Sequence, residues 1–197
     1  AIDALVCINK VDWKQAPYLG APVAQDADVV RWDRFVDKAA EPQSLQLVPA
    51  VREMLLQQLP AEAPVGLFHG DFQWSNLFYS KQGKLLAVID WELVGVGAVL
   101  NDIGWFATFN DPTAWADAAH RGHYMPQAEE LIAMYVDAYG EVLPDIDWYR
   151  ALAAYKFAII TGFNLMLHRR GKRHDPMWET TKDSMQTLLR RAHELLN

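Results

Sequence analysis

Residues 69–76 read His69-Gly70-Asp71-Phe72-Gln73-Trp74-Ser75-Asn76, and the run Ile89-Asp90-Trp91-Glu92 follows shortly after them. An apolar run at 65–69 leads into the first stretch and favours a buried strand. Two further strand-like runs, 77–79 and 85–89, flank a turn at 80–84 that contains a glycine, which predicts a β-hairpin. The hairpin would bring Asn76, just before its first strand, close to Asp90, just after its second.

The residue types in these two runs suit the transfer of a phosphoryl group. Such a transfer needs a carboxylate that positions and deprotonates the attacking hydroxyl, and oxygen ligands for the magnesium that neutralises the nucleotide phosphates. Asp71 fits the first task, and Asn76 and Asp90 fit the second. Taken singly, Asp71 and Asp90 are also compatible with ordinary turn residues, so their spacing carries the interpretation.

The pattern His-Gly-Asp-x-x-x-x-Asn at 69–76, with Ile-Asp-Trp at 89–91 and Asn-Asp-Ile-Gly at 101–104, resembles the aminoglycoside phosphotransferase and choline kinase family. These enzymes are small-molecule relatives of the protein kinases. The resemblance implies that Asp71 is the catalytic base and that Asn76 and Asp90 bind Mg²⁺. It also implies that ATP is the co-substrate and that the acceptor is a hydroxyl of a small molecule.

The same resemblance implies two supporting residues. His69 would support the loop backbone, and Asp102 would be a buried acid that hydrogen-bonds the loop, although Asp102 also suits the N-terminal turn of a helix. Glu92 has two open interpretations, a metal or substrate contact and a salt bridge. Within the family, the opening stretch and the Trp91-Glu92 pair are similar to the phosphotransferase domains fused to acyl-CoA dehydrogenases.

The predicted fold class is α+β, mostly α: the C-terminal lobe of a protein-kinase-like fold with a small catalytic β-hairpin. In this interpretation residues 1–197 form one lobe, with the catalytic loop at 69–76, the metal motif at 89–92 and a helical substrate subdomain at 100–197. Apolar periodicity predicts helices at 26–40, 45–59, 102–109, 113–120, 127–139, 147–167 and 176–196. The helix at 147–167 is apolar enough to be central to the lobe.

Nothing before His69 resembles a nucleotide-binding lobe. The first 68 residues contain neither a glycine-rich phosphate loop nor a Val-Ala-x-Lys strand, the parts that family members carry there. We therefore expect the N-terminal lobe to be absent from this chain. We also expect the isolated chain to be inactive and to self-associate through the apolar face that the missing lobe would cover.

Composition narrows the class of protein further. A length of 197 residues and 51% hydrophobic content allow a substantial core in one domain or two. Cys7 is the single cysteine, so no internal disulfide can form and a cytoplasmic location is expected. The net charge of -7 argues against nucleic acid as a partner, and without an apolar run of membrane-spanning length no membrane partner is expected.

Several features keep more than one interpretation. The basic run 168–174 is compatible with a solvated turn or with an anion-binding rim, and a zinc site at His168, His174 and Asp175 is a weaker alternative. Four aromatic residues could line a substrate pocket or pack in the core: Trp91, Trp105, Tyr155 and Trp178. The chain as a whole could also be a pseudokinase-type binding domain or a metal-dependent phosphohydrolase. The acceptor remains open.

Overall fold

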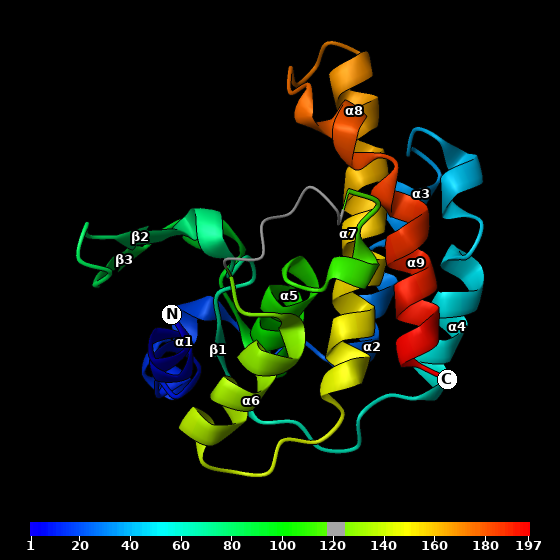
Figure 1. Ribbon diagram of the computed structural model, residues 1–197. Helices are drawn as coiled ribbons and strands as arrows, with labels where there is room; N and C mark the ends of the chain where they lie inside the picture. Colours follow the sequence, from blue (N-terminus) through cyan, green and yellow to red (C-terminus); the bar gives the residue numbers. More distant parts are fainter. Residues whose placement is uncertain (118–124) are drawn as a thin grey trace.

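The fold is organised around one long helix, α7 (Ile146–Arg169), in a computed structural model that describes residues 1–117 and 125–197 (Figure 1). Five helices pack against it: α3 (Asp33–Val36), α4 (Val48–Gln57), α5 (Leu100–Phe109), α8 (Met177–Thr181) and α9 (Ser184–Leu195). The prediction of a central helix at 147–167 is confirmed. By length and composition α7 could also cross a membrane, but 61% of its most apolar window is buried inside the protein, as in the core helix of a folded domain.

Small residues let α7 and α5 approach closely. Ala151, Ala154 and Ala158 are fully buried on α7. On α5, a Cβ added to Gly104 would lie 2.6 Å from the backbone carbonyl of Tyr149, so only glycine fits at this crossing. The close contact holds α5, which carries two residues of the candidate site, in a fixed position against the core.

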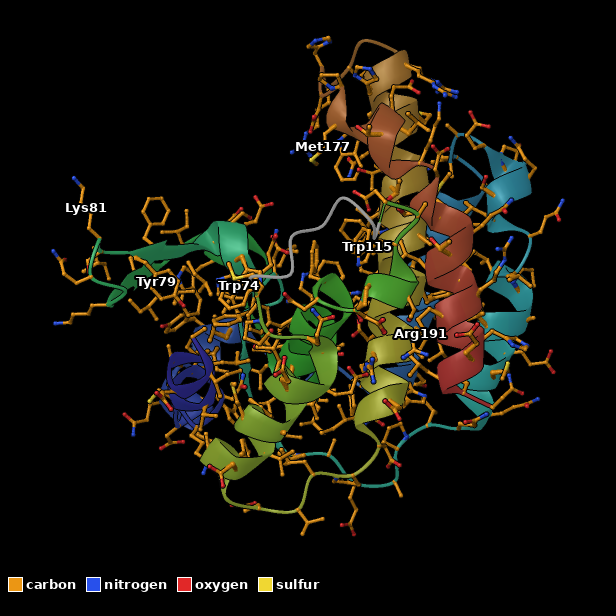
Figure 2. All side chains as sticks on the ribbon, in the orientation of Figure 1. Trp74, Tyr79, Lys81, Trp115, Met177 and Arg191 are labelled. Atoms are coloured by element: carbon orange, nitrogen blue, oxygen red, sulfur yellow. The ribbon has the colours of Figure 1, made fainter. Side chains whose placement is uncertain are left out.

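The strands form two separate antiparallel pairs. β2 (Leu77–Tyr79) and β3 (Leu85–Val88) make the predicted hairpin, which projects from the body of the protein; Tyr79 and Lys81 mark it in Figure 2. β1 (Val65–Phe68) pairs with β4 (Gly95–Ala98), a strand that the sequence did not predict. Gly95 and Gly97 weaken the apolar pattern of β4, but both are needed because the ring of Phe68 packs against them.

The described part of the chain has three further helices: α1 (Ile2–Asn9), α2 (Gln25–Val30) and α6 (Ala128–Tyr139). The prediction of α6 is confirmed, including its end at Gly140, which is left-handed with φ of 77°. The helix predicted at 45–59 is α4, which is shorter because a separate 3-10 turn occupies Pro42–Leu45. Helix α1 was not predicted from the sequence.

Two predicted helices are each divided in the structure. Region 26–40 forms α2 and α3, and the chain then turns where the Ala40 N–H donates to the Gly162 carbonyl of α7 at 2.9 Å. Region 176–196 forms α8 and α9. The hydroxyls of Thr180 and Thr181 both donate to the Met177 carbonyl and compete with the helix ladder there.

The helix predicted at 113–120 is wrong in its described part, where the chain forms a 3-10 turn at Pro112–Ala114. Residues 118–120 lie outside the described residues.

Candidate active site

The loop at 69–76 follows β1 and is tied down by one buried carboxylate. Asp102, in the first turn of α5, is fully buried, and its Oδ2 and Oδ1 accept the backbone N–H groups of His69 and Gly70, each at 2.8 Å. Burial raises the pKa of Asp102, while these hydrogen bonds oppose that effect. The geometry agrees with the loop-bracing role expected for Asp102.

A second layer holds Asp102 itself. Asn9, at the end of α1, donates from Nδ2 to Asp102 Oδ2 and to the Leu67 carbonyl, both at 3.0 Å. The Tyr135 hydroxyl of α6 donates to Asn9 Oδ1 at 2.8 Å. Burial raises the pKa of Tyr135, so its hydroxyl stays protonated as this bond requires. Three helices therefore meet beneath the loop through one chain of hydrogen bonds.

His69 is fully buried and links the loop to the second motif. Its Nε2 lies 2.9 Å from the Ile89 carbonyl, and its Nδ1 accepts the Asp71 N–H at 3.2 Å. These partners assign the ring proton to Nε2. The ring also packs against Trp91 with centroids 4.6 Å apart. His69 thus has the surroundings of the loop-supporting residue that the resemblance implied.

Gly70 gives the loop its shape. Its φ is +88°, in the left-handed region, and an added Cβ would lie 2.5 Å from the Leu93 carbonyl oxygen. Only glycine satisfies both conditions without strain. The following residue, Asp71, is thereby placed beside α5.

The Asp71 carboxylate is half-buried and oriented by three donors. Oδ1 accepts the indole N–H of Trp105 at 2.8 Å, and Oδ2 accepts Asn76 Nδ2 at 2.9 Å. Gln73 Nε2 adds longer contacts of 3.4 Å to both oxygens. Burial raises the pKa of Asp71, and the hydrogen bonds from Trp105, Gln73 and Asn76 work against that rise. A carboxylate with a raised pKa and a fixed orientation suits a general base.

Asn76 and Asp90 flank the hairpin as predicted. Leu77 pairs with Val88 in the register, and the Ile89 N–H donates to the Asn76 carbonyl at 3.0 Å, which brings the two candidate ligands to the same end of the hairpin. Asp90 is exposed and adopts a left-handed conformation, with φ of 66°. Such a conformation costs energy in a residue other than glycine and is most often kept at functional positions.

The oxygen atoms of this pair fit a magnesium ion. The amide nitrogen of Asn76 donates to Asp71, and its Oδ1 makes no hydrogen bond with the described residues, so this oxygen is available to a metal. The Asp90 carboxylate likewise accepts no hydrogen bond from the described residues. Among residues 1–117 and 125–197, no cluster of three or more His, Cys, Asp or Glu side chains could hold a metal. A pair of protein oxygens completed by phosphates is the arrangement that magnesium commonly takes.

Glu92 and Trp91 follow Asp90 in a short 3-10 turn, and both are exposed. Glu92 makes no ion pair with any described residue, so the salt-bridge interpretation finds no partner there. The indole N–H of Trp91 donates to the Val88 carbonyl at 2.9 Å, which fixes its ring over His69.

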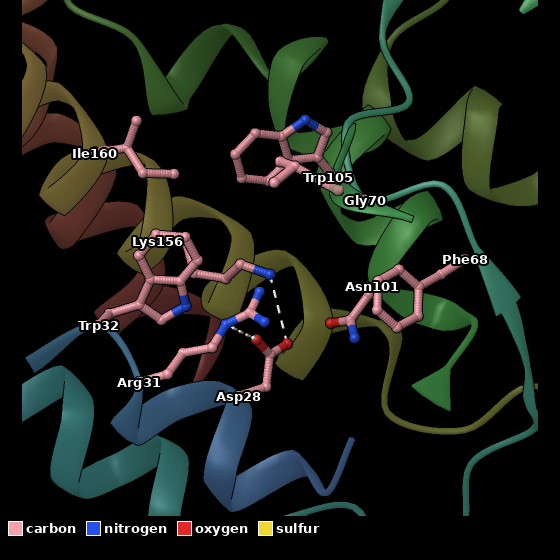
Figure 3. Close-up of a pocket in the computed structure, with 10 residues that line it drawn as sticks. Asp28, Arg31, Trp32, Phe68, Gly70, Asn101, Trp105, Lys156 and Ile160 are labelled. Carbon is pink, nitrogen blue, oxygen red and sulfur yellow. Dashed lines mark hydrogen bonds and ion pairs between the residues drawn. The ribbon is translucent and has the colours of Figure 1, made fainter. Parts of the chain in front are cut away.

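A cavity of about 30 Å³ lies beside the loop (Figure 3). Its walls come from α2 and the two residues after it, β1, the loop, the 3-10 turn after Asp90, α5 and α7. The lining residues are Asp28, Arg31, Trp32, Phe68, Gly70, Leu93, Asn101, Trp105, Lys156 and Ile160. Trp105 contributes both to the cavity and to the loop, because its ring lines the cavity while its N–H donates to Asp71 Oδ1. The cavity therefore lies next to the Asp71 carboxylate.

The other predicted aromatic and basic residues lie elsewhere. Tyr155 is fully buried and Trp178 is nearly so, and neither lines this cavity. The basic run 168–174 ends α7, and none of its residues lines the cavity either; Arg169 pairs with Glu41 and Glu179. The zinc alternative is wrong for the described residues, because the Asp175 N–H donates to His168 Nδ1 and no metal cluster forms there.

Three contributors to this region were not predicted from the sequence: Asn9, Lys156 and the hydrogen bond that Trp105 donates to Asp71. Asn9 lies in an unpredicted helix, and Lys156 is a lysine within an apolar helical stripe. The isolated charge in that stripe was the available signal, since a charged residue on a core helix face is seldom fully buried without a partner.

The chain is similar in sequence to known proteins. A family model described as the phosphotransferase enzyme family matches residues 1–152. Acyl-CoA dehydrogenase family member 11 of Homo sapiens is 32% identical over 139 residues, which are 66% of this chain and 18% of that protein.

Two solved structures share the fold. A candidate aminoglycoside phosphotransferase from Ralstonia eutropha superimposes with a TM-score of 0.78 at 18% identity, over 98% of this chain and 63% of that one. A choline/ethanolamine kinase family protein from Mesorhizobium loti gives a TM-score of 0.58 at 15% identity, over 99% of this chain and 64% of that one. The chain thus spans less than two thirds of these structures and about a fifth of the curated relative.

Proposed function

This chain belongs to the phosphotransferase enzyme family, and we propose that it carries the catalytic base and metal ligands for transfer of the ATP γ-phosphoryl group to a hydroxyl of a small molecule. The observation that carries the proposal is the orientation of Asp71. Its carboxylate is held by Trp105 and Asn76, on a loop that Asp102 fixes through two backbone hydrogen bonds. Positioning of this kind supplies much of the catalysis of phosphoryl transfer.

Each residue has a defined part in the proposed reaction. Asp71 accepts the proton of the acceptor hydroxyl and directs its oxygen toward the phosphorus. Asn76 Oδ1 and the Asp90 carboxylate would hold Mg²⁺, which when bound neutralises charge on the nucleotide phosphates. Asp102 and His69 keep the loop in place, and Glu92, exposed beside Asp90, is available to the metal or the substrate.

We also propose that a nucleotide-binding lobe precedes this chain in the complete protein. The two structural neighbours are longer than the chain by more than a third of their length. Exposed apolar side chains on and after the hairpin give such a lobe a surface to cover; Phe78, Leu86, Ile89 and Leu93 are each at least 40% exposed. Self-association of the isolated chain through this surface stays a prediction, which sedimentation velocity with and without the upstream segment would check. A cytoplasmic location and the lack of nucleic-acid or membrane partners are part of the same proposal.

The deciding experiment measures acceptor-dependent ADP formation by the chain joined to its upstream segment, with a panel of small hydroxyl compounds. We expect turnover that requires Mg²⁺ and that Asp71→Asn abolishes, while nucleotide binding survives because the base acts on the acceptor. Asp37→Asn is the matched control: it makes the same chemical change at an exposed position away from the loop.

The remaining outcomes separate the competing functions. ADP formation that ignores every acceptor and depends on Asp71 would indicate a phosphohydrolase. Nucleotide binding with no turnover under any condition would indicate a binding domain. The chain without its upstream segment should bind no nucleotide tightly, and robust acceptor-dependent turnover by that chain alone would contradict the proposed division into two lobes.

A further inference from the structure

The cavity beside the loop contains a buried ammonium group that the reaction described above does not use. Lys156 is only 9% exposed, and Figure 3 shows its side chain directed toward Asp28, with Asn101 facing the same space. Burial lowers the pKa of Lys156, while the Asp28 carboxylate acts in the opposite direction. A buried charge of this kind on a core helix requires an explanation.

The charges that line the cavity are unequal. Lys156 and Arg31 are cations, and Asp28 is the only carboxylate among the lining residues. That carboxylate is shared: Arg31 Nε lies 2.8 Å from Oδ1 and Lys156 Nζ lies 3.5 Å from Oδ2. The contact between Arg31 Nε and Asp28 Oδ1 is an ion pair without hydrogen-bond geometry, because Oδ1 accepts no hydrogen bond. One anion therefore serves two cations, and the lining carries an excess positive charge.

Polar groups in the cavity also lack partners. An ammonium has three N–H donors, and Lys156 has a single acceptor, at the long distance of 3.5 Å, among the described residues. The Asn101 side chain lines the same cavity and makes no hydrogen bond within the described part of the chain. Donors without acceptors at a cavity next to the proposed base suit a ligand that brings anionic oxygens.

We propose that this cavity binds a carboxylate group of the acceptor, with Lys156 and Asn101 as its donors, so that the acceptor is a hydroxy acid. The inference rests on the proposed phosphotransferase function, because it places the acceptor hydroxyl at Asp71. Trp105 lies between the two ends of such a molecule: its N–H holds Asp71, and Lys156 Nζ lies 5.9 Å from its ring centroid. The carboxylate and the hydroxyl would lie on either side of one indole ring.

Cationic acceptors fit this cavity poorly. An amine or quaternary ammonium group would meet Lys156 and Arg31, while Asp28 is already engaged with both. The aromatic faces that could bind such a cation are those of Trp32 and Trp105, and Lys156 Nζ already lies over them, 5.6 and 5.9 Å from their centroids. The carboxylates of Asp71 and Asp102 are not among the lining residues. They accept hydrogen bonds from the Trp105 indole and from the loop backbone.

The size of the cavity also favours a compact group. A volume of about 30 Å³ corresponds to about two waters, since one water needs about 10–15 Å³ on this scale. Two carboxylate oxygens match that space. A sugar ring does not, so the rest of the acceptor would extend toward the loop.

The test is ligand-observed NMR titration of this chain with straight-chain hydroxycarboxylates of increasing length, beside diols and amino alcohols of the same lengths. We expect at least one hydroxycarboxylate to bind, and the matched diol and amino alcohol to bind at least about tenfold more weakly. Lys156→Met, which keeps the length of the side chain but removes its charge, should weaken carboxylate binding about ten- to hundredfold. Lys156→Arg should retain part of the affinity.

Lys172→Met is the matched control, because it removes the same charge from an exposed position outside the cavity and should leave binding unchanged. Thermal unfolding of each variant separates a lost ligand contact from a lost fold. Equal binding of hydroxycarboxylates and diols, unchanged binding in Lys156→Met, or no hydroxycarboxylate binding at all would each overturn the inference.

The two proposals fail separately. If hydroxycarboxylates bind through Lys156 but the complete protein never phosphorylates them, the carboxylate site stands and the proposed reaction falls. If the complete protein phosphorylates only neutral or cationic acceptors, the reaction stands and the carboxylate site falls.

Discussion

Replacing Asp102 by asparagine should destabilise the protein strongly, although it only exchanges one carboxylate oxygen for an NH₂ group of similar size. The wild-type carboxylate accepts three hydrogen bonds, from the N–H groups of His69 and Gly70 and from Asn9 Nδ2, and donates none. In Asp102→Asn the amide oxygen can take the place of Oδ2 and keep the bonds from His69 and Asn9. The new NH₂ group would then point at the Gly70 N–H, donor against donor.

The magnitude follows from that count. One hydrogen bond to a charged acceptor is lost, a contribution of about 1.5–3 kcal/mol, and buried donors on Gly70 and on the new amide remain unpaired at about 1–3 kcal/mol each. Relief of the burial cost that raises the pKa of Asp102 offsets part of this loss. We expect a net loss of about 3 kcal/mol, a large share of the roughly 5–15 kcal/mol that stabilises a domain.

The assay is urea unfolding followed by tryptophan fluorescence, combined with amide hydrogen exchange of Gly70. The Gly70 amide should exchange on the order of a hundredfold faster in Asp102→Asn, because its acceptor is gone. Asp37→Asn, at an exposed position, should change the unfolding free energy by no more than about 0.5 kcal/mol. A loss below about 1 kcal/mol in Asp102→Asn, with Gly70 still protected, would show that the carboxylate does not hold the loop.

Three further outcomes are expected. Gly104→Ala should destabilise the chain by about 1–3 kcal/mol in thermal unfolding, because the new Cβ would meet the α7 backbone. This loss outweighs the gain of about 1 kcal/mol in helix propensity. A stabilised variant would refute the close contact between α5 and α7. Trp105→Phe removes a donor that lowers the pKa of Asp71, so the acid limb of the kcat/KM–pH profile should move to higher pH, and an unmoved or lowered limb would argue against Asp71 as the base. In the chain joined to its upstream segment, calorimetry should detect Mg²⁺ binding at Asn76 and Asp90 mainly when nucleotide is present; tight binding of the metal alone would favour the hydrolase interpretation.

Much of the site could be predicted because its residues are close together in the sequence. The loop 69–76 and the run 89–92 are joined by a short hairpin, and the alternation and turn residues of a hairpin are local signals. The long helix α7 and the capped helix α6 were predicted for the same reason, since periodicity and a terminal glycine are visible within each segment.

Boundaries that depend on distant residues were predicted poorly. The region 26–40 has one apolar stripe, which predicts one helix. The direction of the chain at the end of this region is set by the hydrogen bond from the Ala40 N–H to the Gly162 carbonyl on α7. β4 was missed because Gly95 and Gly97 have little strand propensity, and the reason for them is the ring of Phe68 on the paired strand.

The sequence by itself determined the chemical groups of the proposed reaction and their local order: the carboxylate of Asp71, the oxygens of Asn76 and Asp90, and the glycine that shapes the loop. These depend on spacing over a few residues. Only the tertiary structure decided how the groups are held and what lies beside them. Asn9 reaches Asp102 across 93 positions, and Lys156 meets Asp28 across 128. Helices that are far apart in the sequence pack their apolar faces into one core, and this brings together polar side chains that no local pattern connects.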